Sequence, residues 1–196
     1  MPKTFEYKAG DVVGFSGNGQ LSVWINLATA GIPWWSLSHA ALIAPHPTTD
    51  ELVLYESTTL YDGPCLVQGK KVAGVQAHDV EKRAADYDGK VWLYSLAAPL
   101  TPEEYAGLRD AATSYLGTRY DRSGAFQARQ AGFGWLERLC IRRPEDLSSL
   151  FCSEFVAACL KSIGRFEVEN VSIFNPNRLG RELLSREIVT KPVRLK

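Results

Sequence analysis

The sequence has no excess of charge of either sign, because 22 Lys and Arg residues balance 22 Asp and Glu residues. Nucleic-acid-binding proteins normally carry a basic excess or a basic stripe, so we expect no nucleic-acid partner. The four cysteines include no Cys-x-x-Cys pair, which argues against a zinc ribbon and against a redox dithiol. Nothing in this pattern predicts a metal site.

Long hydrophobic runs are also missing, since no stretch approaches the ~20 continuous apolar residues of a membrane-spanning helix. Residues 12–49 contain no Asp, Glu, Lys or Arg, but glycines, prolines and polar side chains interrupt this region. We therefore expect it to form core, or the wall of a site that avoids charge. The first residues, MPKTFEYKAGD, contain no apolar secretory core, which predicts a cytoplasmic protein with reduced thiols.

The remaining composition is that of an ordinary globular protein. The 196 residues are 45% hydrophobic and 22% charged, which suits one folded domain over residues 1–196. A domain of this size buries roughly 70% of its extended-chain surface, so it needs neither a disulfide nor a metal for stability. The pattern gives no indication of the oligomeric state.

The first half of the chain reads mainly as β-structure. Short apolar runs separated by turn residues predict an antiparallel, meander-like sheet. One short helix is expected at residues 21–28. The five predicted strands cover residues 12–15, 38–44, 52–57, 75–78 and 90–96.

The second half reads as helices. Thr101, Pro102 and Glu104 form a capping box with a proline at the first helical position, and apolar residues at helical spacing follow. We predict an α+β fold in which an antiparallel sheet from the N-terminal half packs on helices from the C-terminal half. The later elements are a weaker helical stretch at 122–140, a strongly amphipathic helix at 151–163, a short helix capped by Asn175 and an edge strand within 188–195.

His39 lies in a predicted strand that is otherwise small or apolar. If residues 45–50 form the loop of a hairpin, His39 stands directly opposite Glu56, with Cβ atoms ~4.5–5.5 Å apart. The carboxylate would then fix the imidazole tautomer and stabilise the imidazolium. A slip of one residue would send Glu56 to the opposite face, and an ordinary surface His–Glu pair is the alternative. His46 and His78 have no neighbours that indicate chemistry.

Cys152 is the best-placed candidate nucleophile in the sequence. An N-cap at Ser148 or Ser149 puts it in the first turn of the predicted helix. The unpaired N–H groups and the positive dipole end at that position favour the thiolate form. The same geometry leaves backbone N–H groups around Cys152 and Ser153 free to hold an oxyanion.

A purely structural interpretation of Cys152 stays open, because its spacing to Cys159 and to other apolar residues also fits the first core position of the helix. Cys159 is expected in the core. Cys65 and Cys140 are expected in a turn and at a helix end, without a chemical role. Glu154 should point away from Cys152 on the helix.

Four short segments occur in a characteristic order, namely GDVV at 10–13, SHAAL at 38–42, YEST at 55–58 and FCSEFV at 151–156. This order resembles the permuted papain-like cysteine hydrolases of the YiiX/YaeF type, relatives of the NlpC cell-wall peptidases and of the lecithin:retinol acyltransferase-like enzymes. In ordinary papain-like chains the cysteine helix precedes the histidine strand, whereas in the permuted group the strands come first. The resemblance implies a circularly permuted papain-like (NlpC-like) fold.

Carried over residue by residue, the resemblance implies that Cys152 is the nucleophile, His39 the general base and Glu56 the orienting third residue. The GTRYD segment is similar to a Gly-x-x-Tyr-Asp element of the family, which implies that Tyr120 lies near the site and donates to the oxyanion. A tyrosine that only packs after the end of a helix is the alternative. The stretch 122–147 departs from the family pattern and is expected to be a lid or a specificity insert.

The resemblance implies a cysteine hydrolase that cleaves an amide bond in a peptide, a cell-wall peptide or an acyl amide. It would act through a thioacyl intermediate, without a metal or an organic cofactor. Two alternatives stay open. A lipid acyl hydrolase or acyltransferase on the same fold would use the charge-free region, with Trp24, Trp34 and Trp35, as an acyl groove. A non-catalytic papain-like scaffold would bind a peptide and need no thiolate.

Overall fold

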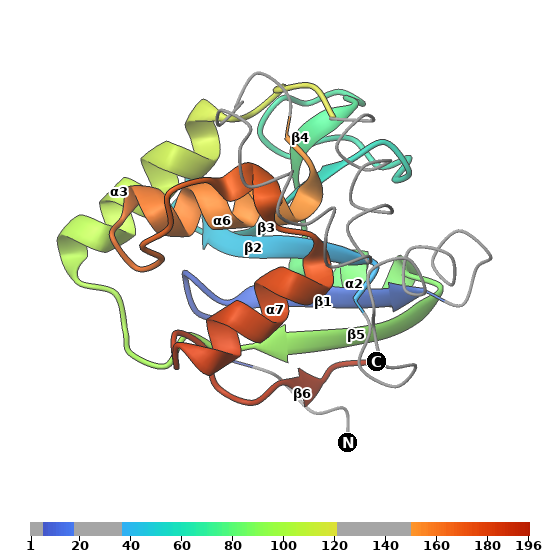
Figure 1. Cartoon of the computed structure of the whole chain (residues 1–196). Helices are drawn as coiled ribbons and strands as arrows, with labels where there is room; N and C mark the ends of the chain where they lie inside the picture. Colours follow the sequence, from blue (N-terminus) through green and yellow to red (C-terminus); the bar gives the residue numbers. More distant parts are fainter. Residues whose placement is uncertain (1–5, 18–36, 121–149) are drawn as a thin grey trace.

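The computed structural model describes residues 6–17, 37–120 and 150–196, and these residues form an α+β fold with one antiparallel sheet (Figure 1). Within them, six strands lie in the order β4-β3-β2-β1-β5-β6. All five strands predicted in the first half are confirmed, with ends shifted by no more than two residues. The strands are β1 (Val12–Gly17), β2 (His39–Pro45), β3 (Leu52–Thr58), β4 (Gly74–His78), β5 (Gly89–Tyr94) and β6 (Val193–Arg194).

The first four strands form the predicted meander, in which each strand pairs antiparallel with the next. β5 departs from it, because it returns across the sheet to pair with β1, with Val12 opposite Tyr94. β6 supplies the predicted edge strand, although only Val193 and Arg194 join β5. β1 therefore has a strand on each side, with β2, β3 and β4 on one side and β5 and β6 on the other.

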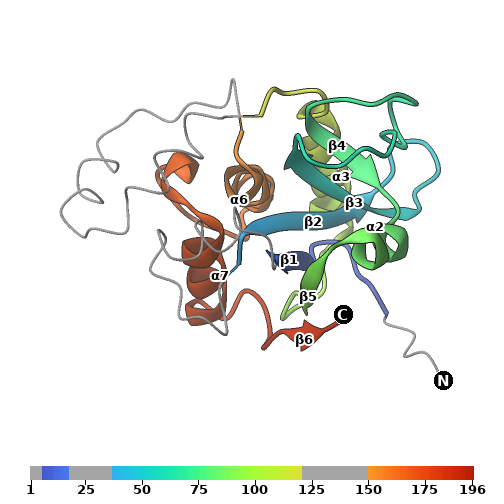
Figure 2. The same cartoon turned by 90° about the vertical axis from the view of Figure 1, so that its right-hand side faces the viewer.

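Helices cover both faces of the sheet. α6 (Cys152–Ser162) and α7 (Pro176–Ser185) lie on one side of β1 and β2, and α2 (Val80–Asp86) lies on the other (Figure 2). α3 (Pro102–Ser114) packs on α6 and β2, and a short 3-10 helix, η1 (Val171–Ile173), contacts α6. The helices of the second half thus pack on the sheet as predicted, whereas α2 was not predicted from the sequence.

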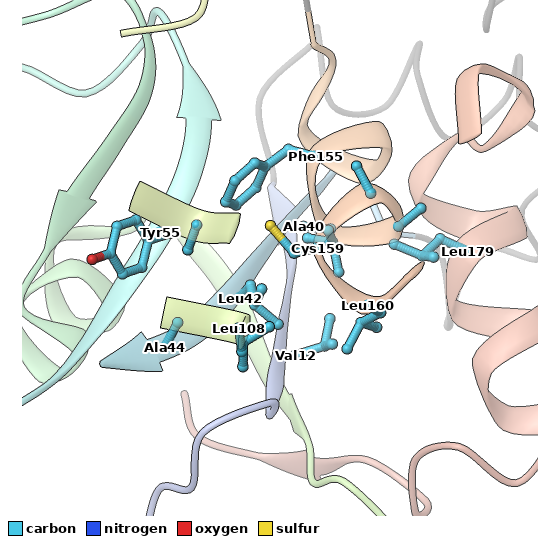
Figure 3. Close-up of a cluster of buried hydrophobic side chains, with 14 of the residues drawn as sticks. Val12, Ala40, Leu42, Ala44, Tyr55, Leu108, Phe155, Cys159, Leu160 and Leu179 are labelled. Carbon is cyan, nitrogen blue, oxygen red and sulfur yellow. The ribbon is translucent and has the colours of Figure 1, made fainter. Parts of the chain in front are cut away.

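Alternation along the strands builds two apolar clusters. On the α6 side, Leu42 of β2 joins Phe155 and Cys159 in the larger cluster (Figure 3). On the α2 side, Ile43 of the same strand joins Val80 of α2. Burying each large apolar side chain contributes roughly 1.5–3 kcal/mol, so both helix layers hold the sheet in place.

Capping side chains fix the starts of α3 and α7. Thr101 Oγ1 accepts the backbone N–H of Glu104 (3.2 Å), and Glu104 Oε2 accepts the backbone N–H of Thr101 (2.8 Å). Asn175 Oδ1 accepts the backbone N–H of Arg178 (2.8 Å) at the start of α7. Caps of this kind contribute about 1 kcal/mol each, and both predicted helix starts are confirmed.

Several expectations fall on residues that the structure does not describe. They are the helix at 21–28, the helical stretch at 122–140, the insert at 122–147, Cys140 and the tryptophans at 24, 34 and 35. Among the helices of the described part, none combines the length and the hydrophobicity that crossing a bilayer requires.

Candidate active site

His39 and Glu56 contact each other, but the predicted register of their hairpin is wrong. Leu42 lies opposite Tyr55, because the loop covers residues 46–51, so Glu56 stands diagonal to His39. This shift of two residues keeps both side chains on one face, since side-chain direction alternates with period two. Diagonal neighbours remain within reach of long side chains. Nε2 of His39 lies 2.5 Å from Oε2 of Glu56.

Glu56 is the fully buried centre of a polar cluster. Its Oε1 accepts a hydrogen bond from Nε of Arg83 (2.5 Å), and its Oε2 accepts one from Nη2 of Arg83 (3.1 Å). Burial alone would raise the pKa of Glu56. The hydrogen bond and charge of His39, followed by the charge and hydrogen bonds of Arg83, instead lower this pKa to about 2. Glu56 is therefore ionised at neutral pH.

His39 lies between Glu56 and Cys152, where β2 begins. Burial alone would lower the pKa of His39, but the charge and hydrogen bond of Cys152, followed by the hydrogen bond and charge of Glu56, raise it to about 9. Because Nε2 faces Glu56, Nδ1 is the ring nitrogen left for the thiol. Phe15 packs against the imidazole with ring centroids 5.4 Å apart, and 13% of the His39 side chain stays exposed.

Cys152 is the first residue of α6, so its predicted place in the first helical turn is confirmed. The predicted cap at Ser148 or Ser149 is wrong, because the N-cap is Phe151. Glu154 supplies the missing cap, since its Oε2 accepts the backbone N–H of Phe151 (2.8 Å). Glu154 is therefore buried and folded back on the first turn instead of pointing away. A carboxylate in this position complements the positive end of the helix.

The three cysteines that the structure describes are equally buried and differently surrounded. Cys159 lies in the apolar cluster on the α6 side, as predicted, and burial raises the pKa of its thiol. Cys65 is buried in a turn, where its Sγ accepts the backbone N–H of Ala77 (3.2 Å). Cys152 is 1% exposed, yet it belongs to neither apolar cluster and raises the pKa of His39.

The two predicted oxyanion residues lie next to the start of α6. The buried Ser153 hydroxyl donates to the carbonyl of Phe174 (2.6 Å), so it secures the packing of the helix. The backbone N–H groups of Cys152 and Ser153 have no partner within the helix, since the first four N–H groups of a helix have none. The half-buried Tyr120 packs edge-on against Phe151, with ring centroids 5.7 Å apart. Its part in catalysis stays a prediction.

Sequence reasoning misses two members of the cluster, His78 and Arg83. The expectation that His78 has no chemical neighbour is wrong, because its Nε2 lies 3.9 Å from Oε1 of Glu56. Burial lowers the pKa of His78, against the charge of Glu56. The pairing of β3 with β4 could have indicated this contact, since Gln76 stands opposite Glu56 and His78 is two residues further along the same strand. Arg83 lies on α2, and without that helix nothing in the sequence places it.

Comparisons with known proteins find a similarity in fold. No protein-family profile matches the sequence, and no curated protein sequence does. The fold is similar to the crystal structure of the metalloprotein YiiX from Escherichia coli O157:H7, with a TM-score of 0.56 and 18% sequence identity. The match covers 96% of this chain and 89% of YiiX. At this identity the likeness shows the fold, and it agrees with the predicted resemblance to YiiX-type proteins at that level.

The cluster around Glu56 does not fit a metal ion. In the described part of the chain, no three His, Cys, Asp or Glu side chains gather as a metal site requires. Both oxygens of Glu56 are bonded to Arg83, and the fixed positive charge of Arg83 opposes a second cation at the same carboxylate. The arrangement suits proton transfer between a thiol and an imidazole.

Proposed function

We propose that the protein is a cysteine hydrolase that cleaves amide bonds, with Cys152 as nucleophile, His39 as general base and acid, and Glu56 orienting His39. One observation supports this most directly: the imidazole is hydrogen-bonded to a buried, ionised carboxylate on one side, and its pKa is raised by the Cys152 thiol on the other. A nucleophile, a base within reach and a group that orients the base are the parts of nucleophilic catalysis. We further propose a single, circularly permuted papain-like domain, because the sheet precedes the cysteine helix in the chain.

In the acylation step, the thiol proton of Cys152 already resides on His39, whose pKa of about 9 keeps the imidazole protonated at neutral pH, and the sulfur attacks the carbonyl carbon of the amide. A C–S bond forms, and the carbonyl oxygen becomes an oxyanion. The backbone N–H groups of Cys152 and Ser153, with Tyr120 as a further donor, stabilise this oxyanion. The protonated His39 then gives its proton to the leaving nitrogen as the C–N bond breaks, and an amine departs.

In the deacylation step, His39 takes a proton from water, and the resulting hydroxide attacks the thioester carbon. The C–S bond breaks and a carboxylic acid leaves. Cys152 and His39 then share one proton as they did before the reaction. Because the pKa of Glu56 is about 2, its carboxylate stays ionised through both steps and stabilises the imidazolium. Water is the only co-reactant, and a peptide, a cell-wall peptide or an acyl amide is the proposed substrate class.

The first test compares the thiols within one protein. Cys152, Cys159 and Cys65 are 1%, 0% and 0% exposed, so exposure alone predicts equal rates of alkylation by iodoacetamide. We expect Cys152 to react at least tenfold faster, as followed by mass spectrometry of each cysteine peptide, and His39→Ala to remove the difference. Equal rates for the three thiols in the wild type would contradict the proposal and favour a non-catalytic peptide-binding scaffold.

The second test separates the substrate classes. Wild type and Cys152→Ser are incubated with peptide amides, acyl amides and short-chain acyl esters, and the released amine or acid is measured. Amide hydrolysis that disappears in Cys152→Ser supports the proposed function. Turnover of esters alone, with transfer of the acyl group to added alcohols or amines, would replace it with an acyltransferase.

A further inference from the structure

Arg83 is a buried charged residue to which the mechanism above gives no part. It lies in the last turn of α2 and is 6% exposed. Its Nε and Nη2 reach the two carboxylate oxygens of Glu56 at 2.5 and 3.1 Å, which is the two-pronged geometry of an arginine–carboxylate pair. A lysine would supply the charge but not the second fixed donor. The contact therefore fixes the orientation of Glu56 as well as its charge.

Three aromatic rings surround the guanidinium of Arg83. Its central carbon lies 4.9 Å from the ring centroid of Phe15, 4.7 Å from that of Tyr61 and 5.4 Å from that of Tyr87. Such rings attract the cation and restrict the plane of the guanidinium. Phe15 also packs against the imidazole of His39, so one ring borders both the guanidinium and the proposed catalytic base.

Charged and titratable side chains face Glu56 from three elements, namely His39 on β2, His78 on β4 and Arg83 on α2. The buried Nε2 of His78 forms no hydrogen bond and lies 3.9 Å from Glu56, so His78 competes for the carboxylate whenever its ring is protonated. An arginine guanidinium carries a fixed positive charge in proteins. Arg83 therefore holds both oxygens of Glu56 whatever the state of His78.

We propose that Arg83 is a positioning residue that acts on His39 through Glu56. It keeps the buried carboxylate ionised and holds Oε2 at Nε2 of His39, which leaves Nδ1 directed at the thiol of Cys152. The inference rests on the proposed hydrolase function and adds a fourth residue to the chain of contacts that orients the base.

The experiment compares Arg83→Gln and Arg83→Lys with Lys82→Gln, a matched control. Lys82 is the preceding residue on α2, is exposed, and pairs with Asp86 instead of Glu56. At pH 7 we expect Arg83→Gln to lower kcat and the alkylation rate of Cys152 at least tenfold, with KM unchanged. Arg83→Lys should lower both rates by about three- to tenfold, because the charge remains and the second donor is lost. Lys82→Gln should have the kcat, KM and Cys152 alkylation rate of the wild type.

Two readouts distinguish positioning from simple stabilisation. The first is the imidazole NMR signal of His39 between pH 2.5 and 7. Once the guanidinium is gone, burial raises the pKa of Glu56, so Arg83→Gln should show an added inflection that the wild type and Lys82→Gln lack. The second is the Glu56→Gln/Arg83→Gln double variant, which should be no slower than Glu56→Gln, because Arg83 acts only through that carboxylate.

The outcomes decide between the alternatives. The inference is overturned if Arg83→Gln folds like Lys82→Gln, keeps the wild-type kcat and shows no added inflection in the His39 signal. It is also overturned if the double variant loses as much kcat as the two single variants combined. If Arg83→Gln does not fold, Arg83→Lys decides, and a wild-type rate in it overturns the inference. A wild-type Cys152 no more reactive than Cys65 refutes the hydrolase function instead, whereas the His39 signal still reports whether Arg83 keeps Glu56 ionised.

Discussion

Replacing Glu56 by glutamine keeps the shape of the side chain and removes its charge from the centre of the polar cluster. The new amide can still accept one hydrogen bond, but its NH2 group must face a donor of Arg83 or His39. Breaking a buried ion pair by removing one partner typically costs about 3–5 kcal/mol, because the remaining charge stays buried without compensation. We expect Glu56→Gln to lose stability of this order at pH 7.

The same contacts make this loss depend on pH. The pKa of Glu56 falls from 4.5 to about 2 on folding, which corresponds to about 3 kcal/mol of stability. Because the folded-state pKa is the lower one, this contribution is present above pH 4.5 and disappears as the pH falls through 2. Glutamine does not titrate. The stability difference between wild type and Glu56→Gln should therefore narrow by about 3 kcal/mol between about pH 5 and pH 2.

Urea unfolding followed by tryptophan fluorescence at several pH values between 7 and 2 measures this difference. Glu51→Gln is the control, because Glu51 is an exposed carboxylate in the loop of the same hairpin. Its stability difference from the wild type should stay near zero throughout. A difference for Glu56→Gln that does not change with pH would refute the reasoning, since the carboxylate would then gain nothing from His39 and Arg83 on folding.

Two further predictions concern the base and the sheet edge. The rate of amide hydrolysis should fall above pH 9, because the leaving nitrogen needs the proton of His39, whose pKa is about 9. Alkylation of Cys152 needs no proton donor, so its rate should not fall. Measuring both rates over the same pH range checks this. Gly74→Ala should lower the free energy of unfolding by ~1–3 kcal/mol or more, as measured by urea titration. The φ of Gly74 is +116°, and a Cβ there would lie 2.0 Å from the Thr118 carbonyl oxygen. Gly69 also has a positive φ but lies in open space, so Gly69→Ala should lower the free energy of unfolding less.

Features that depend on neighbours in the sequence could be predicted. The capping box at Thr101 and Glu104 involves residues three apart, so the pattern alone specifies the helix start. The alternation in β2 is equally local, and it determines which side chains face α6 and which face α2. His39 and Glu56 meet for the same reason, because parity decides the face even when the register is off by two.

Features that a pattern within one segment does not specify could not be predicted. The register of the β2–β3 hairpin follows from which residues form the turn, and the turn residues of 45–50 allow more than one hairpin. Arg83 reaches Glu56 only because β4, α2 and β3 come together in three dimensions, since the two residues are 27 positions apart in the sequence. No periodicity in a single segment reports such a contact. The role of Tyr120 likewise rests on a resemblance and not on a local pattern.

The two cysteines of α6 show why burial alone does not decide whether a thiol is reactive. Cys152 and Cys159 are seven residues, or two turns, apart, so they share a helix face and lie about 10 Å apart along the axis. Cys159 shares its apolar cluster with Leu42, where burial raises the pKa of the thiol and nothing stabilises a negative sulfur. Cys152 meets His39 instead, at the point where β2 begins and the apolar cluster ends. The position of the helix along the strand therefore selects which of two equally buried thiols can act as a nucleophile.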